Sequence, residues 1–564
     1  MSRSDSQLKA AHQRATKSST KEKHYRTSLV KVLHSTLICF GVSAAMVLPC
    51  GVFAQTDTPV ASVARSYDIP SGYLEAALNQ FVKQAGINVS FDAAKVKGIA
   101  VQELKGSFTT QAGLNRLLVG SGLEAVPQAN GYLIRKSVLA DNRIAILPPV
   151  NVSAPTITGP ADGYLATQAF SATRTNTPLR DVPQSITVVT KDQIRDQNML
   201  SIADVVRYVP GVGVSQGEGN RDAVIFRGNN STGDFFVDGL RDDAQYFRDL
   251  YNIERVEVLR GANGMIFGRG GAGGVINRVT KEAGWTPINE VSVQYGSFSH
   301  KRVAIDIGRA INDVVAFRLN AMYEHSNSFR NGVDVERGGV NPTFTIKPSA
   351  QTKIVLGGEY FTDNRVNDRG IPSAGTVTGV VESGRPADTH RSTFFGDPNR
   401  SPNSVDVKAL NSLVEHAFDN GLTVRNHTRY AVYDKFYQNV FASGSATAQD
   451  ATGTVNIQAY NDATERSNVF NRTDFVYALN TGPVKHELLA GVEYGRQVTD
   501  NFRNNGYFNN NFTNGGRTSS VPFFNPISGV PLTFRPDPTG IAGGPTANNH
   551  GVVDVVSVYL QDQV

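Results

Sequence analysis

The chain has 564 residues, more than one compact core usually holds, so we expect several domains. Charged residues make up 19% and hydrophobic residues 40% of the chain, a balance too apolar for a disordered chain and too polar for a helical membrane protein. The net charge is +5, but residues 1–34 alone carry +6 and the remainder sums to −1, so the basic balance does not indicate a nucleic-acid partner.

The N-terminus has the pattern of a secretory signal peptide over residues 1–54. A basic segment precedes an uncharged apolar stretch at 37–48, and the small side chains that follow predict cleavage after Ala54. A membrane anchor is the weaker alternative, because Pro49 and several small residues interrupt an apolar core shorter than the roughly 20 residues that a spanning helix needs. Both cysteines lie inside this leader, so we expect neither a disulfide nor a thiolate metal site in the mature chain.

Residues 65–137 show two copies of a strand–helix–strand pattern, which predicts a small α+β domain. The first helix carries apolar residues at helical spacing, namely Leu74, Ala77, Leu78 and Phe81. Together with Tyr67-Asp68-Ile69-Pro70 before it and Gly120-Ser121-Gly122-Leu123 after the second helix, this unit resembles the short N-terminal domain shared by secretins and signalling TonB-dependent receptors. A generic periplasmic α+β module is the alternative.

Residues 138–174 lose periodicity and are rich in Pro, Ala, Thr and Gly, which is typical of a flexible linker. A short β-prone segment lies between prolines within it and consists of Val150, Asn151, Val152, Ser153 and Ala154. The flanking prolines keep this segment extended, so its backbone groups stay free to join the sheet edge of another protein. In sequence and in position the segment resembles a TonB box.

Residues 175–283 mix short strands with short helices, which predicts an α/β domain. A formal G-x-G-x-x-G occurs near its end, at Gly268, Gly270 and Gly273. A dinucleotide site needs a helix to begin at the third glycine, whereas the β-branched residues at 275–280 predict a strand. We therefore expect no nucleotide site, and we expect the glycines to allow tight turns.

Six motifs of this domain follow one another in a distinctive order. They are Leu179 to Ser185, Asp204 to Val212, Phe226-Arg227-Gly228, Asp238-Gly239, Ile253 to Val258, and Gly268 to Asn277. This order closely resembles the plug domain of TonB-dependent ferric siderophore receptors. An unrelated α/β domain is the alternative.

Residues 286–564 alternate apolar and polar side chains in long segments separated by loops rich in Asn, Gly, Asp and Pro. Strands of about ten residues with one apolar and one polar face are typical of outer-membrane barrels, whereas a soluble sandwich prefers shorter strands. We expect about ten such strands, whereas plugged transporter barrels have about 22, so roughly half of the barrel is expected to be missing from this sequence. The predicted fold is therefore multidomain, with a small α+β periplasmic signalling domain, an α/β plug domain and a transmembrane antiparallel β-barrel that is incomplete in this chain.

The sequence offers no catalytic constellation, so we predict that the protein is not an enzyme. Histidines beyond the leader are scattered without HxH or HExxH spacing, and no G-x-S-x-G occurs. We expect no metal site and no cofactor of the protein's own. Ferric iron would be bound only as a siderophore chelate, which needs aromatic faces and arginine donors at the outer surface of the plug.

The resemblance to siderophore receptors places candidate ligand-binding residues in three loops of the plug. By motif register these are Arg221 in the first loop, Gly233 and Asp234 in the second, and Tyr246 and Phe247 in the third, with Arg241 and Arg248 flanking the aromatic pair. The third loop is more similar to that of catecholate receptors. For each arginine the alternative is an ion pair with one of the neighbouring carboxylates, Asp242, Asp243 or Asp249.

The same resemblance implies an outer-membrane receptor that imports a ferric siderophore with work supplied by TonB and its inner-membrane motor proteins. Residues 65–137 would lie in the periplasm and report ligand binding to an anti-sigma regulator, and the barrel would contact outer-membrane lipid. Three alternatives stay open: a receptor for another large nutrient such as cobalamin or a different chelate, a secretin-like secretion channel, and an importer whose signalling domain is vestigial.

Overall fold

The computed structural model describes residues 65–92, 96–128, 131–136, 163–175, 177–261, 266–268, 270–271, 273–377, 380–381, 385–535 and 548–564. The predicted signal peptide and the predicted TonB box lie outside these residues. The chain divides into two compact units, Met1–Val150 and Asn151–Val564. Among the described residues, none of the helices has the length and apolar character to cross a membrane.

The first unit packs two helices against three small sheets. Its helices are α2 (Leu74–Ala85) and α4 (Thr110–Leu117), and its sheets pair β1 (Arg65–Ile69) with β5 (Leu104–Phe108), β2 (Gly72–Tyr73) with β4 (Ala100–Val101), and β7 (Gly131–Lys136) with both β3 (Val89–Ser90) and β6 (Leu123–Gln128). Leu74 and Phe81 on the inner face of α2 are fully buried, and the ring of Phe81 stacks on Tyr67 with centroids 4.6 Å apart. The predicted helical spacing therefore does form the core of this unit.

The plug is built on a five-stranded sheet. Its order is β13 (Leu240–Arg241), β12 (Phe235–Val237), β15 (Gly274–Thr280), β14 (Ile253–Arg260) and β8 (Ser185–Thr190). A second, three-stranded sheet contains β9 (Val212–Val214), β10 (Val224–Phe226) and β11 (Asn229–Ser231). The helices α5 (Lys191–Asp196) and α6 (Ile202–Val206) complete the domain, together with a short 3-10 helix at Leu179–Asp181 and a tight left-handed turn at Gly217–Gly219. Strands β14 and β15 are buried along almost their whole length, so the sheet is covered on both faces.

The glycine-rich motif continues into β15, as its β-branched residues predicted, and not into a helix. Gly274 has a φ of 151°, and a side chain at this position would clash with the Leu259 carbonyl oxygen and the Phe226 ring. Close backbone approach thus explains glycine here.

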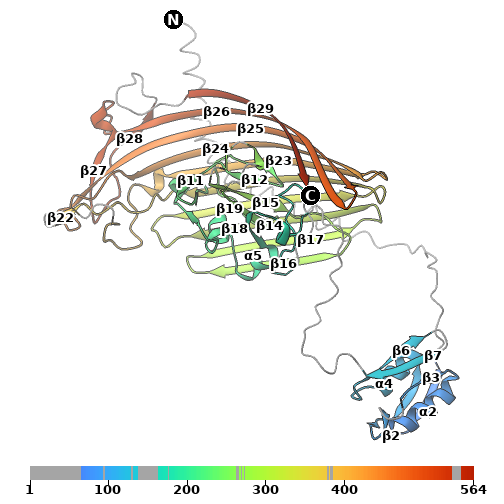
Figure 1. Cartoon of the computed structure of the whole chain (residues 1–564). Coiled ribbons are helices and arrows are strands. Elements are labelled where there is room, and N and C mark those ends of the chain that lie inside the picture. Colours follow the sequence, from blue (N-terminus) through green and yellow to red (C-terminus); the bar gives the residue numbers. More distant parts are fainter. Residues whose placement is uncertain are drawn as a thin grey trace. The chain divides into compact units, whose positions relative to one another are not determined.

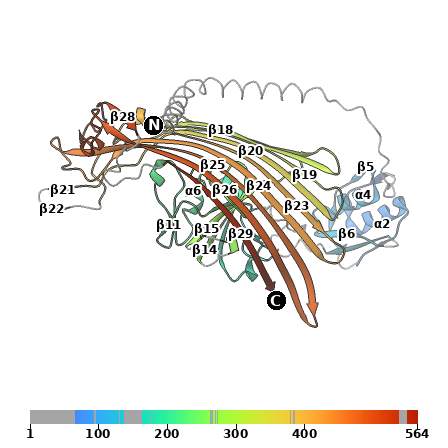
Figure 2. The same cartoon turned by 90° about the horizontal axis from the view of Figure 1, so that it is seen from above.

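The largest sheet of the described residues has twelve strands, of which ten are long and antiparallel. They are β16 (Ile288–Gly296), β17 (His300–Ala310), β18 (Val315–Asn327), β19 (Asp334–Ile346), β20 (Thr352–Val366), β23 (Pro402–Ala417), β24 (Leu422–Ala442), β25 (Thr454–Thr481), β26 (Val484–Phe508) and β29 (Asn548–Gln563). Figures 1 and 2 show this sheet as a curved wall with the plug against its concave face.

Side chains alternate between the two faces of the wall as the sequence predicted. In β18 the polar residues Arg318, Asn320 and Glu324 are buried on the plug side, whereas Phe317 and Tyr323 point away from the plug. Polar side chains that face the plug and apolar side chains on the outer face are the arrangement of an outer-membrane barrel wall.

The two ends of the wall differ in their connections. At the short-turn end only a few residues join neighbouring strands, for example at 418–421 and 482–483. At the long-loop end the connections are extended and carry β21 (Thr376–Val377), β22 (Val380–Val381), β27 (Ser519–Pro522) and β28 (Leu532–Arg535), with 3-10 helices at Pro398–Arg400 and Asn514–Arg517. These connections share a buried apolar cluster that includes Phe395, Phe508 and Phe523.

The core of the first unit gives a stability prediction. Replacing Phe81 by alanine removes a fully buried ring, so we expect amides of α2 to lose about 3 kcal/mol of protection in hydrogen exchange of the full chain. Val119→Ala, at a position that is 75% exposed, is the control and should leave α2 unchanged. Equal protection in both variants would contradict this account of the core.

Candidate functional site

A buried polar network holds two of the predicted ligand residues, Arg248 and Tyr246. The Arg248 side chain is inaccessible to solvent, and its guanidinium donates to the Asp242 carboxylate, to the Asp222 carboxylate at 3.3 Å, and to the backbone carbonyls of residues 242, 244 and 246. These bonds use all five N–H groups of the side chain. The Tyr246 hydroxyl donates to Asp242 at 2.9 Å, and its ring lies 4.4 Å from the guanidinium.

Asp242 is the centre of this network. It accepts hydrogen bonds from Arg248 at 3.2 Å, from Arg278 at 2.5 Å, and from Tyr433 of the barrel wall at 2.5 Å. Burial alone would raise the pKa of Asp242, but the charges of Arg248 and Arg278 outweigh burial and lower it. Burial, and the charge of Asp242, raise the pKa of Tyr246 to about 12, so Tyr246 stays a hydrogen-bond donor. The network therefore joins the plug to the wall.

The carboxylates next to Arg248 have separate partners. Asp242 pairs with Arg248, as the ion-pair alternative supposed, and Asp222 is a further partner that the sequence did not indicate. Asp249 instead pairs with Arg302 of the barrel wall at 2.7 Å and Asp243 with Arg466 at 2.5 Å. In this structure Arg248 and Tyr246 thus brace the plug and present almost no surface to a ligand.

The second predicted loop is fixed by contacts within the plug. Asp234 accepts hydrogen bonds from the Ser231 hydroxyl at 2.7 Å and from the Gly271 backbone N–H at 2.9 Å. Arg241 donates to the Gly233 carbonyl at 3.2 Å, and its guanidinium lies 4.8 Å from the Phe236 ring centroid. The structure therefore brings Gly233, Asp234 and Arg241 together with part of the glycine-rich motif.

The third loop contacts the wall through its second aromatic residue. Phe247 is half-buried, and the guanidinium of Arg365, near the long-loop end of β20, lies 4.1 Å from its ring centroid. Phe247 therefore contacts the wall, whereas its sequence neighbour Tyr246 lies in the buried network around Asp242.

A cluster of charged and aromatic side chains surrounds Arg221 where the plug meets the long-loop end of the wall. Arg221 donates to Glu218 at 2.7 Å, and Arg369 donates to the other oxygen of the same carboxylate at 2.9 Å. The Tyr460 hydroxyl donates to Glu218 at 3.2 Å, and that of Tyr437 donates to the Glu218 backbone carbonyl at 3.5 Å. Burial would raise the pKa of Glu218, but the hydrogen bond from Arg221 and the charge of Arg369 lower it. Glu218 is therefore a carboxylate held by arginines of two different elements.

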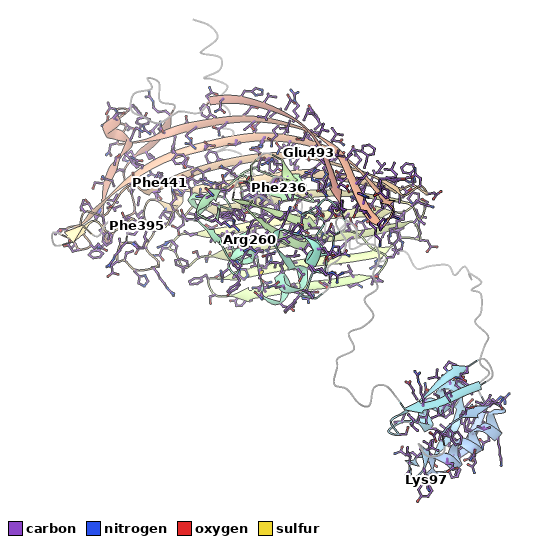
Figure 3. The ribbon with its side chains drawn as sticks, in the orientation of Figure 1. Lys97, Phe236, Arg260, Phe395, Phe441 and Glu493 are labelled. Carbon is purple, nitrogen blue, oxygen red and sulfur yellow. The ribbon has the colours of Figure 1, made fainter. Side chains whose placement is uncertain are left out.

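Aromatic faces complete this cluster, which we call the loop-end cluster: Glu218, Arg221, Arg369, Tyr437, Phe441, Tyr460 and Arg503. The Tyr460 ring lies 5.2 Å from Tyr437 and 5.9 Å from Phe441, between centroids. Arg369 stacks on Phe441 at 3.9 Å and Arg503 on Tyr460 at 4.7 Å. Figure 3 shows Phe441 at the same end of the wall as Phe395 of the long connections.

Sequence reasoning found Arg221 but missed the other members of the loop-end cluster. Tyr437 and Phe441 lie in one strand, four residues apart, and alternation therefore places them on one face with Tyr433. That spacing was readable in the sequence, but nothing in it said which lumenal residues would meet Arg221. Among the described residues, no group of three or more His, Cys, Asp or Glu side chains could hold a metal ion.

Two stretches of the sequence match known domain families. Residues 178–275 match the TonB-dependent Receptor Plug Domain, and residues 87–137 match the Secretin and TonB N terminus short domain. In sequence order, the chain therefore carries a short N-terminal domain followed by a plug domain. The match to a receptor plug domain argues against the alternative of a secretin-like secretion channel.

Curated relatives are receptors and transporters. The catecholate siderophore receptor Fiu of Escherichia coli strain K12 is 28% identical over 411 residues, which cover 68% of this chain and 51% of the relative. The probable TonB-dependent receptor BfrD of Bordetella pertussis is 31% identical over 364 residues, 63% of this chain and 48% of the relative. The ferrichrome outer membrane transporter/phage receptor of E. coli is 27% identical over 435 residues, 72% and 56%. The chain spans about half the length of these relatives.

Solved structures share the fold. The pyoverdine outer membrane receptor FpvA of Pseudomonas aeruginosa matches with a TM-score of 0.61 and 22% identity, over 72% of this chain and 58% of FpvA. The closed form of the ferric-catecholate import receptor Fiu from E. coli matches with a TM-score of 0.59 and 25% identity, over 71% and 56%. The predicted fold class is confirmed, and this chain, as predicted, is an outer-membrane protein and not an enzyme.

The buried network gives a prediction that separates bracing from ligand contact. Arg248→Ala leaves Asp242 and Asp222 without one of their cationic partners, so we expect the plug to lose about 3 to 5 kcal/mol of stability. The measurement is urea-dependent hydrogen exchange of β14 and β15. Arg207→Ala is the control, because the Arg207 side chain is 64% exposed and its pair with Asp204 contributes less than about 1 kcal/mol. Unchanged plug protection in Arg248→Ala would contradict the bracing role.

Proposed function

We propose that this chain, a TonB-dependent receptor by its plug, its short N-terminal domain and its fold, is the uptake receptor for a ferric siderophore. The observation that carries the proposal is the loop-end cluster, in which Arg221 of the plug converges with arginines and aromatic rings of the wall. Relatives whose names state siderophore binding, such as the catecholate receptor Fiu, support the same conclusion.

The chemistry of the loop-end cluster suits such a ligand. A ferric siderophore is a bulky and often anionic chelate, so its recognition needs cationic donors and flat apolar faces. Arg221, Arg369 and Arg503 supply the donors, and Tyr437, Phe441 and Tyr460 supply the faces. Outer-membrane barrels have short periplasmic turns and long extracellular loops, so the long-loop end faces the outside, where the chelate arrives.

The predicted plug residues take different parts in this proposal. Arg221 and Phe247 contact the chelate, because both are partly accessible where the plug meets the wall. Gly233, Asp234 and Arg241 hold the second loop in shape, and Tyr246 and Arg248 act through the plug's attachment to the wall. We therefore propose direct contact with the chelate for Arg221 and Phe247, whereas the other five predicted residues shape or brace the site.

Energy and signalling enter through the N-terminal segments. Val150 to Ala154 would pair as a β-strand with TonB, whose inner-membrane motor proteins supply the work of import. The short N-terminal domain would report ligand binding to an anti-sigma regulator in the periplasm, a role supported by its match to the family shared with secretins.

A binding experiment tests the ligand assignment. Intrinsic fluorescence of the full-length protein should be quenched saturably by a ferric catecholate. Arg369→Ala and Tyr460→Ala should each weaken binding about tenfold, because each removes a charged or stacked contact worth about 1.4 kcal/mol. Arg309→Ala, at the short-turn end of β17, is the matched control and should bind normally.

The same titration distinguishes a ferric chelate from another class of large nutrient. Saturable binding of cobalamin without binding of any ferric chelate would keep the fold and refute the iron assignment.

Deletion of residues 65–137 tests the signalling role. Because these residues belong to a compact unit separate from the plug, uptake of a labelled ferric chelate should stay within about twofold of the full-length protein. Transcription that responds to the chelate should be lost. If transcription in the deletion strain still followed the chelate, or never followed it in the parent strain, the short domain would have no signalling role.

A further inference from the structure

One carboxylate of the plug, that of Glu218, forms ion pairs with arginines from two parts of the fold. Glu218 presents one oxygen to Arg221 at 2.7 Å and the other to Arg369 at 2.9 Å. Arg221 belongs to the plug, whereas Arg369 follows β20 in a long connection of the wall. The Glu218 side chain is 31% exposed, so solvent and solutes can reach it.

The backbone around Glu218 is held in an unfavourable conformation. Gly217, Glu218 and Gly219 have φ angles of 61°, 56° and 74°, all in the left-handed region. Glycine adopts this region freely, but glutamate does so only when its contacts hold it there. The loop is also pressed against the wall, because a side chain at Gly219 would lie 2.6 Å from the Asp368 carbonyl oxygen.

Charge around Glu218 favours an anion. Arg221 and Arg369 bring two positive charges to this one carboxylate, whereas the nearby Arg503 is paired with Asp462 at 3.0 Å. The carboxylate oxygens therefore mark the positions at which two guanidinium groups and the Tyr460 hydroxyl direct their hydrogens. Any anionic oxygen ligand of similar spacing would satisfy the same donors.

We propose that Arg221 and Arg369 form an anion subsite, and that Glu218 is an internal stand-in for an anionic group of the chelate. This inference rests on the proposed function. An anionic ferric chelate binds at full strength by taking the two arginines from Glu218, and a neutral chelate cannot do so. The subsite thus selects anionic chelates, with catecholates as the chemical class it fits.

Displacement of Glu218 has a consequence for the plug. Once its carboxylate leaves the arginines, residue 218 keeps only the long contact from the Tyr437 hydroxyl to its backbone carbonyl, at 3.5 Å, within this cluster. We therefore expect the backbone at 217–219 to relax from the left-handed region. The ligand then binds the plug with a relaxed backbone at 217–219 better than the plug with the left-handed backbone. Such a difference in affinity is required if ligand binding is to shift the plug from one conformation to another. Glu218 is accordingly a positioning residue whose removal should favour the ligand.

The experiment compares the full-length protein with three variants. Glu218→Gln removes the charge but keeps the shape, and Glu218→Gly also removes the unfavourable backbone conformation. Glu336→Gln is the matched control, because Glu336 lies on β19 and accepts a hydrogen bond from Tyr323 at 3.0 Å, outside the loop-end cluster. The probes are a ferric tris-catecholate, which is anionic, a neutral ferric trihydroxamate, and inorganic phosphate.

We expect both Glu218 variants to bind the ferric tris-catecholate about tenfold more tightly, with binding of the trihydroxamate and the behaviour of Glu336→Gln changed less than twofold. In hydrogen exchange without any probe, amides at 216–221 should exchange faster in Glu218→Gln than in the parent protein. Weaker catecholate binding in both Glu218 variants, like that expected for Arg369→Ala, would overturn the proposal and make Glu218 a brace of the site.

The phosphate arm separates this inference from the proposed function. If no ferric chelate bound the parent protein, the siderophore assignment would fail while the anion subsite stayed testable. Millimolar phosphate that slows exchange at 216–221 in Glu218→Gln, but not in the parent protein, would then support the subsite. An equal response in both proteins would overturn it.

Discussion

A fully buried carboxylate, that of Asp242, lies at the centre of the contact between the plug and the wall. Asp242 accepts hydrogen bonds from Arg248 and Arg278 of the plug and from Tyr433 of the wall. A lone charge in such a place would be strongly unfavourable, but the two arginines compensate it, and the tyrosine uses a remaining lone pair. Because the partners come from both parts, the plug sheet and the wall hold one orientation relative to each other. The packed rings of Tyr246, Phe361 and Tyr433 surround the network and exclude water from it.

The inner face of the wall is polar for the same reason, since buried charges of the plug need charged or hydrogen-bonding partners. Asp249 of the plug meets Arg302 and Arg337 of the wall, and Glu324 lies against both arginines. A plug with so many charged groups could not pack against an apolar surface, since each unpaired charge would lose its hydration. The outer face of the wall shows the reverse pattern, with exposed apolar side chains such as Phe344 and Leu356. Alternation along the strands therefore gives the two faces of the wall opposite polarity.

The spacing of apolar and polar residues in the sequence predicted most of the fold but little of the candidate site. Strand alternation predicted about ten wall strands, and the β-branched residues after Gly273 predicted β15 in place of a nucleotide-binding helix. Both patterns are local, so one sequence suffices to see them. The loop-end cluster is different, because Arg221 and Tyr460 lie 239 positions apart and meet at the Glu218 carboxylate where the plug packs against the wall. Motif position placed Arg221 near a ligand but could not distinguish it from Arg248, whose five donors are used inside the plug.

Asp242 and Glu218 show how two similar carboxylates take opposite parts. Each is bound by two arginines and by a tyrosine of the wall, and the charges keep both ionised. Asp242 is inaccessible, so no solute can compete for its partners, and its contacts hold the plug in place. The Glu218 side chain is partly accessible, so a solute can reach its contacts. Its backbone has a φ in the left-handed region, which is unfavourable for glutamate. Under the proposed function, a chelate that arrives from the long-loop end would meet the accessible carboxylate of Glu218 first, while the buried carboxylate of Asp242 still joins the plug to the wall.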